Sequence, residues 1–180
     1  VAIVGPAPSI VGSGLGPRID SYDRVVRLNH ALPIRKDLEP DLGTRTDVLY
    51  HNLWQRSPKA IAFQELVGLL KGSVQWVCAS HPYTNAGGNH AGYMRLDVLQ
   101  NQVPFRTVSP RPYIRIKVRN RCLPSAGIAA IQDLLQLDIE ELFITGFTFY
   151  QGKEVYHEGY RGVGLISWLH SPERQLAQMM

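Results

Sequence analysis

His170, near the end of the chain, is the strongest candidate for acid–base chemistry. His170 immediately precedes Ser171 and Pro172, a pair typical of a helix start. A helix N-terminus disfavours imidazolium, so it keeps the His170 ring neutral and able to accept a proton. His157 lies in a polar, glycine-rich stretch, residues 152–164, that we expect to form a lid. For any single histidine, a surface or hydrogen-bonded role is the alternative.

Other residues could hold an anion or a nucleotide. Ser125, Ala126 and Gly127 follow a proline and predict a helix start whose backbone N–H groups could bind a carboxylate or phosphate. A plain helix cap is the alternative. Asn29 follows the apolar run 24–28, and its amide could serve a ribose, a base or a phosphate. A turn residue explains Asn29 equally well.

Glycines end the first and last apolar runs. Gly5 could let a ligand approach the backbone ahead of Ser9, and Gly146 could let a flat group pack beside Phe147. A tight turn is the alternative in both places. The later glycines at 12, 14 and 16 do not fit the dinucleotide pattern, because a proline stands where its third glycine is needed. The sequence therefore argues against NAD.

The chain shows no metal-binding spacing, since it has no H-x-x-x-H, C-x-x-C or Asp-x-Asp. We expect no metal and no cofactor, and we interpret residues 138–141 as a solvated acidic turn. Residues 104–121 carry six basic side chains and no acid, so the net charge of +4 leaves −2 elsewhere. Residues 113–119 alternate in polarity, which favours the charged face of an edge strand over an anion- or nucleic-acid-binding surface. We expect no nucleic acid partner.

The elements that must position these residues follow from apolar patterning. With 180 residues, 44% hydrophobic and 19% charged, the chain suits one compact domain, residues 1–180. Nearly continuous apolar runs predict strands covered on both faces, at residues 1–4, 24–28, 47–50, 74–79 and 142–145. Helical patterns alternate with them, at residues 57–72, 124–135 and from 171 onward. We therefore predict an α/β, Rossmann-like three-layer domain with a mostly parallel sheet, whose ligands bind at the strands' carboxyl ends.

The location of the protein is predicted from what the sequence lacks. No apolar run reaches the length of a membrane span, and no signal peptide precedes the first strand. Cys78 and Cys122 are too few for a disulfide framework, which favours a reducing, cytoplasmic compartment. The chain begins at Val1, so an N-terminal extension with a Golgi or membrane anchor is the alternative.

Taken together, the fragments resemble the animal-type sialyltransferases, glycosyltransferase family 29. Residues 1–29 resemble the large motif of that family, and residues 124–147 resemble its small motif. The short third and fourth motifs are matched by residues 156–158 and 170–173. The order of the motifs is kept, while residues 32–120 match only in general pattern.

The resemblance implies a GT-A-variant fold and a metal-independent, inverting transfer of sialic acid or Kdo. The sugar would move from a CMP-sugar donor to a glycan hydroxyl. The donor-binding residues it implies are Gly5, Ser9, Asn29, Ser125, Ala126, Gly127, Gly146 and Phe147. His157 would stabilise the departing phosphate, and His170 would deprotonate the acceptor.

The sequence departs from the family at several positions. Pro6 and Ser9 stand where the family usually has Asn, and Ala126 where it has Thr. The cysteine pair linking the two long motifs is missing, which fits a cytosolic bacterial, viral or plant-like relative. A catalytically silent nucleotide- or glycan-binding domain is the alternative. The presence of both His157 and His170 argues against it, since a pure binder needs no base.

Overall fold

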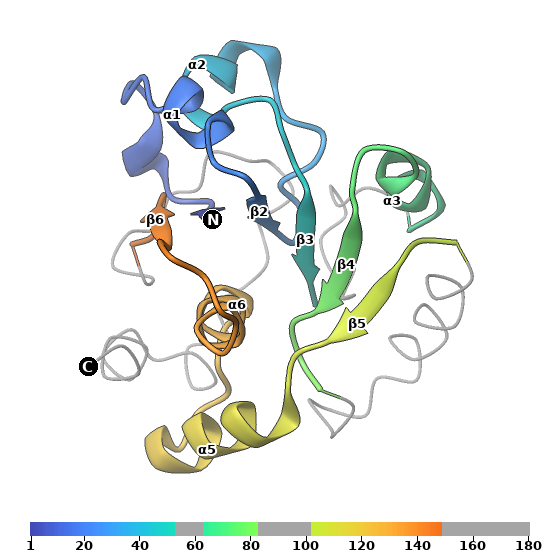
Figure 1. Cartoon of the computed structure of the whole chain (residues 1–180), viewed down its shortest axis with the longest axis vertical. Coiled ribbons are helices and arrows are strands. Elements are labelled where there is room, and N and C mark those ends of the chain that lie inside the picture. The colour runs from blue at the N-terminus through green and yellow to red at the C-terminus, as the bar shows by residue number, and fades with distance from the viewer. Residues whose placement is uncertain (53–62, 83–101, 149–180) are drawn as a thin grey trace.

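A computed structural model describes residues 1–52, 63–82 and 102–148. Within them, six strands form one parallel sheet in the order β5-β4-β3-β2-β1-β6 (Figure 1). The strands are β1 (Ala2–Val4), β2 (Val25–Leu28), β3 (Val48–His51), β4 (Trp76–Ala79), β5 (Phe105–Thr107) and β6 (Phe143–Thr145). The helices are η1 (Pro8–Ile10), α1 (Gly16–Asp20), η2 (Lys36–Leu38), α2 (Glu39–Leu42), α3 (Phe63–Leu70), α5 (Pro110–Asn120) and α6 (Ala126–Leu134). The predicted parallel α/β architecture is confirmed.

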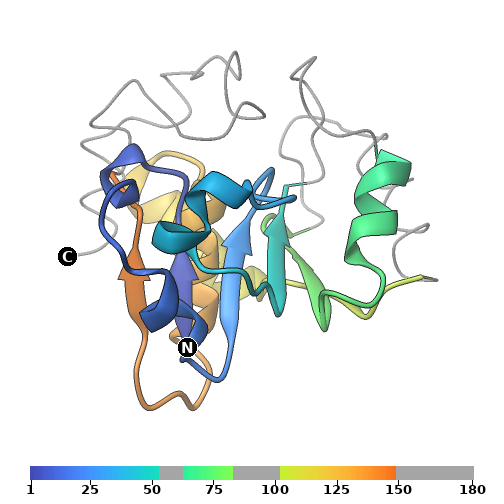
Figure 2. The same ribbon diagram turned by 90° about the horizontal axis from the view of Figure 1, so that it is seen from above.

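Helices cover both faces of the sheet, which explains why its strands are mostly apolar. Figures 1 and 2 show α6 on one face and α1, α2 and α3 on the other. Ile3 and Val26 pack with Ala130 of α6. Their chain neighbours on the opposite face, including Val25, pack with Ile19 of α1. Adjacent strand residues therefore enter different cores, as expected of a sheet between two helical layers.

The carboxyl ends of all six strands meet at one edge of the sheet, where the arrowheads lie in Figure 2. From β1 the chain proceeds strand by strand to β5, and it returns to place β6 on the other side of β1. The strand order thus reverses between β1 and β6. In open parallel sheets, ligands bind at the carboxyl edge beside such a reversal.

Residues 113–119 form part of helix α5, so the edge-strand prediction for them is wrong. Ser109 precedes the helix and Pro110 occupies its first position, both typical of a helix start. Tyr113 is buried and Ile116 is half-buried three residues later, so the apolar pattern follows a helical period. The edge strand on this side of the sheet is β5, which precedes the helix and which the apolar patterning did not predict.

Other helix predictions have mixed outcomes. Ser125 caps α6 as predicted, because its Oγ accepts the N–H of Ile128 at 3.3 Å. Helix α3 ends shortly before Gly72, whose positive φ of 83° suits the chain reversal there. The starts expected at Ser57 and Ser171 lie outside the described residues. In the part of the chain that is described, no helix is long and apolar enough to cross a membrane.

Candidate active site

Most of the predicted donor-binding residues lie at the carboxyl edge, around the reversal of strand order. Gly5 follows β1 and Gly146 follows β6. The two strands continue to bond beyond their ends, because the N–H of Gly5 donates to Thr145 O and that of Ala7 to Gly146 O, each at 2.8 Å. The sequence segments 1–29 and 124–147 therefore meet here through their backbones.

The ring of Phe147 explains why positions 5 and 127, both predicted as ligand contacts, are glycines. A Cβ on Gly5 would overlap the carbonyl oxygen of Gly146 and lie 2.8 Å from the Phe147 ring. A Cβ on Gly127 would lie 2.7 Å from the same ring. Gly146 has a φ of +70°, which other residues rarely adopt. A Cβ on Gly146 would lie 2.6 Å from the carbonyl oxygen of Gly5, so these two glycines let the ends of β1 and β6 approach each other.

The first turn of α6 leaves backbone donors open beside this ring. The Ser125 hydroxyl takes the N–H of Ile128, while the N–H groups of Ala126 and Gly127 donate to no acceptor in the described structure. Leu28, at the end of β2, would lie 3.4 Å from a Cβ on Gly127, so α6 starts next to that strand end. The geometry fits a carboxylate or phosphate.

Asn29 adopts a left-handed conformation directly after β2, with φ of +45°. Its backbone N–H donates to Tyr50 O at 2.7 Å, and its Oδ1 accepts the N–H of Asn52 at 2.9 Å. These bonds fix the carboxamide, whose NH₂ group makes no hydrogen bond to the described residues and is left to donate to a ligand. Ser9 is exposed in η1, and no hydrogen bond links its side chain to this group.

A buried polar cluster, which the sequence analysis missed, anchors α6 to the sheet. The Tyr50 hydroxyl donates to Asp133 Oδ2 at 2.6 Å and accepts from Arg106 Nη2 at 2.8 Å. Arg106 also pairs with Asp133 directly. Burial raises the pKa of Tyr50, so its hydroxyl stays protonated and keeps donating. The cluster joins β3, β5 and α6, and thereby fixes the direction of α6.

Histidines also follow the strands at this edge. The His30 and His51 rings meet edge to face with centroids 5.4 Å apart, and both side chains are buried. His81, after β4, has its Nδ1 2.7 Å from the Tyr113 hydroxyl. Burial raises the pKa of Tyr113, so its hydroxyl stays protonated beside the His81 ring. Their spacing in the sequence matched no ligand motif, so only the fold associates them with the site.

The glycine-rich turn after η1 is filled by a carboxylate of the protein. The N–H groups of Gly12 and Gly14 donate to the two carboxylate oxygens of Asp41 at 2.7 and 2.8 Å. Both glycines have positive φ, and a Cβ on either would meet open space, so conformation alone requires glycine there. These bonds hold the pKa of Asp41 below its usual value.

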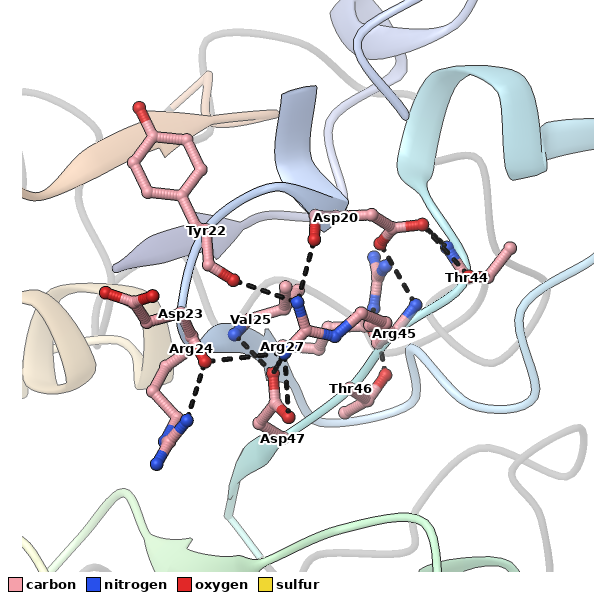
Figure 3. Close-up of polar contacts among 10 residues, drawn as sticks. All are labelled: Asp20, Tyr22, Asp23, Arg24, Val25, Arg27, Thr44, Arg45, Thr46 and Asp47. Atoms are coloured by element: carbon pink, nitrogen blue, oxygen red, sulfur yellow. Dashed lines mark hydrogen bonds and ion pairs between the residues drawn. The ribbon is translucent and has the colours of Figure 1, made fainter. Parts of the chain in front are cut away.

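Asp20 at the end of α1 binds backbone N–H groups in the same way, and Figure 3 shows its contacts with Thr44 and Arg45. Its carboxylate accepts the N–H groups of Thr44 and Arg45 at 2.8 and 3.1 Å, just after α2. Burial acts to raise the pKa of Asp20, but the bonds from Thr44 and Arg45 lower it overall. An aspartate of α1 thus binds the loop after α2, and an aspartate of α2 binds the loop before α1.

The predicted catalytic residues, His157 and His170, lie outside the described residues, and their roles stay predictions. Among the residues that the structure describes, no group of three His, Cys, Asp or Glu side chains could hold a metal ion. Cys78 and Cys122 are buried and form no disulfide, and burial raises the pKa of the Cys78 thiol to about 12. Cys78 is therefore a small buried residue of the core.

Comparisons with known proteins agree with this fold. Two crystal structures of a mammalian sialyltransferase, one in complex with Gal-beta-1-3GalNAc-ortho-nitrophenol, match the fold with TM-scores of 0.57 and 0.61 at 19% identity. The matches cover 99% of this chain but 63% of each of those chains. Residues 1–129 match the family model of glycosyltransferase family 29 (sialyltransferase). The chain therefore belongs to glycosyltransferase family 29, the sialyltransferases.

Proposed function

We propose that the protein transfers a carboxylated sugar, sialic acid or Kdo, from a CMP-sugar to a glycan hydroxyl. Membership of glycosyltransferase family 29 supports this reaction class. The observation that carries the proposal is the pair of unfilled donor sets at one sheet edge. These are the amide of Asn29 and the N–H groups of Ala126 and Gly127. An anionic nucleotide with a carboxylated sugar presents acceptors for both sets.

Each donor set has its own part in the proposed complex. Asn29 and the Gly5–Ser9 loop hold CMP, and the first turn of α6 binds the sugar carboxylate. The carboxylate gains from the positive end of the helix dipole as well as from the N–H groups. Because Phe147 packs against Gly127, the ring limits how far the sugar can move along this turn.

Two histidines complete the proposed mechanism. His157 stabilises the phosphate as CMP leaves, and His170 removes the proton of the acceptor hydroxyl. The hydroxyl oxygen then attacks the anomeric carbon from the face opposite CMP, which inverts its configuration. CMP leaves as a monophosphate, so the mechanism needs no divalent ion to bridge a diphosphate. The lack of a disulfide between the buried Cys78 and Cys122 supports a reducing, cytoplasmic location for this chemistry.

The test is a transfer assay with CMP-sialic acid and CMP-Kdo on mixed glycan acceptors, run beside CMP binding. We expect transfer from one donor, a rate unchanged by EDTA, and loss of transfer in His170→Ala with CMP affinity near wild type. His90→Ala serves as the matched control, because this histidine has no role in the proposal and should retain activity.

Two outcomes would count against the proposal. CMP binding without transfer from either donor would support a catalytically silent binding domain. Inhibition by EDTA that Mn²⁺ reverses would exclude the metal-free mechanism.

A further inference from the structure

Helix α5 presents four side chains away from the protein, here called the α5 outer face: Arg111, Ile114, Arg115 and Val118. They are spaced three, four and seven residues from the first, which places them on one side of a helix. Tyr113, on the opposite side, is buried. Ile114 is 42% exposed and Val118 is 70% exposed, although both are large apolar residues. Figure 1 shows α5 on the outer side of α6.

Helix α5 as a whole is also strongly basic, and two of its arginines lie on the α5 outer face. Helix α5 carries Arg111, Arg115, Lys117 and Arg119 and no acidic residue. All four side chains are exposed, and no carboxylate of the described residues pairs with any of them. Their charge is therefore available to an external anion.

We propose that the α5 outer face binds the surface of a bilayer that contains anionic lipids. A basic helix with apolar side chains on its outward face can insert those side chains below the headgroups while its cations meet the lipid phosphates. The long arginine side chains can reach the headgroups from either side of Ile114 and Val118. The described part of the chain has no helix that spans a membrane. Binding through α5 would hold this part against a membrane surface.

Apolar exposure is what favours lipid over nucleic acid. A phosphate backbone would engage the arginines but offers nothing to bury Val118, and the aromatic ring of α5, Tyr113, faces inward and cannot stack on a base. The binding proposed here is independent of the reaction, because α5 contains none of the predicted catalytic or donor-binding residues.

The experiment is flotation of the purified chain with vesicles of phosphatidylcholine alone or with 30 mol% phosphatidylserine, roughly the charge density of an anionic leaflet. We expect binding to the anionic vesicles only. Each basic residue near such a surface contributes about fivefold in affinity, so Arg111→Gln/Arg115→Gln should weaken binding by on the order of 20-fold. Ile114→Ser/Val118→Ser should also weaken it, while retaining every charge.

The matched control is Lys36→Gln/Lys71→Gln, which removes the same charge from exposed sites elsewhere and should change binding less than twofold. Circular dichroism checks that each variant folds. Equal losses in the control and the α5 charge variant would overturn the proposal. So would binding to a 12-base-pair DNA duplex that Ile114→Ser/Val118→Ser leaves unchanged, because that pattern identifies a polyanion site.

Discussion

Two sets of backbone N–H groups in small, glycine-containing segments of this protein differ in whether the chain itself supplies their acceptor. The glycine-rich turn at residues 12–14 points its N–H groups at Asp41, so its anion is built into the chain. The first turn of α6, at Ala126 and Gly127, has no such partner among the described residues. Glycine content therefore does not distinguish a structural turn from a ligand site. What distinguishes them is whether the fold brings a carboxylate to the donors.

The comparison also shows where each set gets its rigidity. The turn at residues 12–14 is held from within, by the reciprocal aspartates of α1 and α2. The first turn of α6 is held from outside, by Phe147 at one end of the helix and by the cluster of Tyr50, Arg106 and Asp133 towards the other. An open donor set needs external support, since no internal acceptor orients it.

Removing Asp133, which anchors α6 and its open N–H groups, should cause the largest loss of stability. Asp133→Ala leaves the buried Tyr50 hydroxyl without its acceptor and the half-buried Arg106 guanidinium without its partner. We expect a loss of roughly 2–4 kcal/mol in unfolding free energy, measured by urea denaturation. Tyr50→Phe removes only the hydroxyl and should cost about 1 kcal/mol. Equal losses for the two variants would mean that Asp133 does not anchor α6 through both partners.

Adding a side chain at Gly5 should cause the next largest loss of stability. The Cβ in Gly5→Ala would overlap the backbone oxygen of Gly146, which cannot move without disturbing the β1–β6 pairing, so we expect a loss of about 2 kcal/mol. Gly127→Ala meets the half-buried Phe147 ring, which can shift, and should cost less. Gly68→Ala, in the middle of α3 with open space around it, should stabilise by up to about 1 kcal/mol. If Gly5→Ala melts like wild type, the two strand ends are not in contact.

Removing the Asp41 carboxylate from the turn at residues 12–14 should cause the smallest loss of stability, and that loss should depend on pH. The pKa of Asp41 is lowered in the folded protein, so its contribution to stability is present above the ordinary carboxyl pKa of 3.8 and lost as the pH falls below it. Asp41→Asn should therefore melt lower than wild type at pH 7, and the difference should shrink towards pH 3. A constant difference across this range would show that the carboxylate charge does not matter to the turn.

Much of the fold could be predicted because its signals are local. Runs such as Ala2–Val4 are apolar at every position, as expected of a strand covered on both faces. The start of α6 was predictable for the same reason, since Ser125 caps the helix within three residues. Helix α5 was misassigned because Ile114, Ile116 and Val118 alternate with charges, as in a strand, while Pro110 at the helix start was overlooked.

The site was less predictable because its contacts cross long stretches of chain. Arg106 reaches Tyr50 over 56 residues, and Tyr50 reaches Asp133 over 83, so no spacing in the sequence relates them. Residue types alone pointed correctly to a strand end for Asn29, but not to its bond with Asn52. They also could not show that Gly5 and Gly127 make room for Phe147, since a glycine in sequence does not reveal what lies against it.

The most direct test of the central claim is a calorimetric titration with CMP of the wild-type chain, Asn29→Asp and Asp41→Asn. Asn29→Asp keeps the acceptor for the Asn52 N–H but loses the NH₂ donors, so we expect CMP affinity to fall about tenfold or more. Asp41→Asn should bind CMP like wild type, and UMP, ADP and NAD should bind to none of the three. CMP binding that Asp41→Asn abolishes and Asn29→Asp leaves intact would contradict the account, because the nucleotide would then lie at the glycine-rich turn.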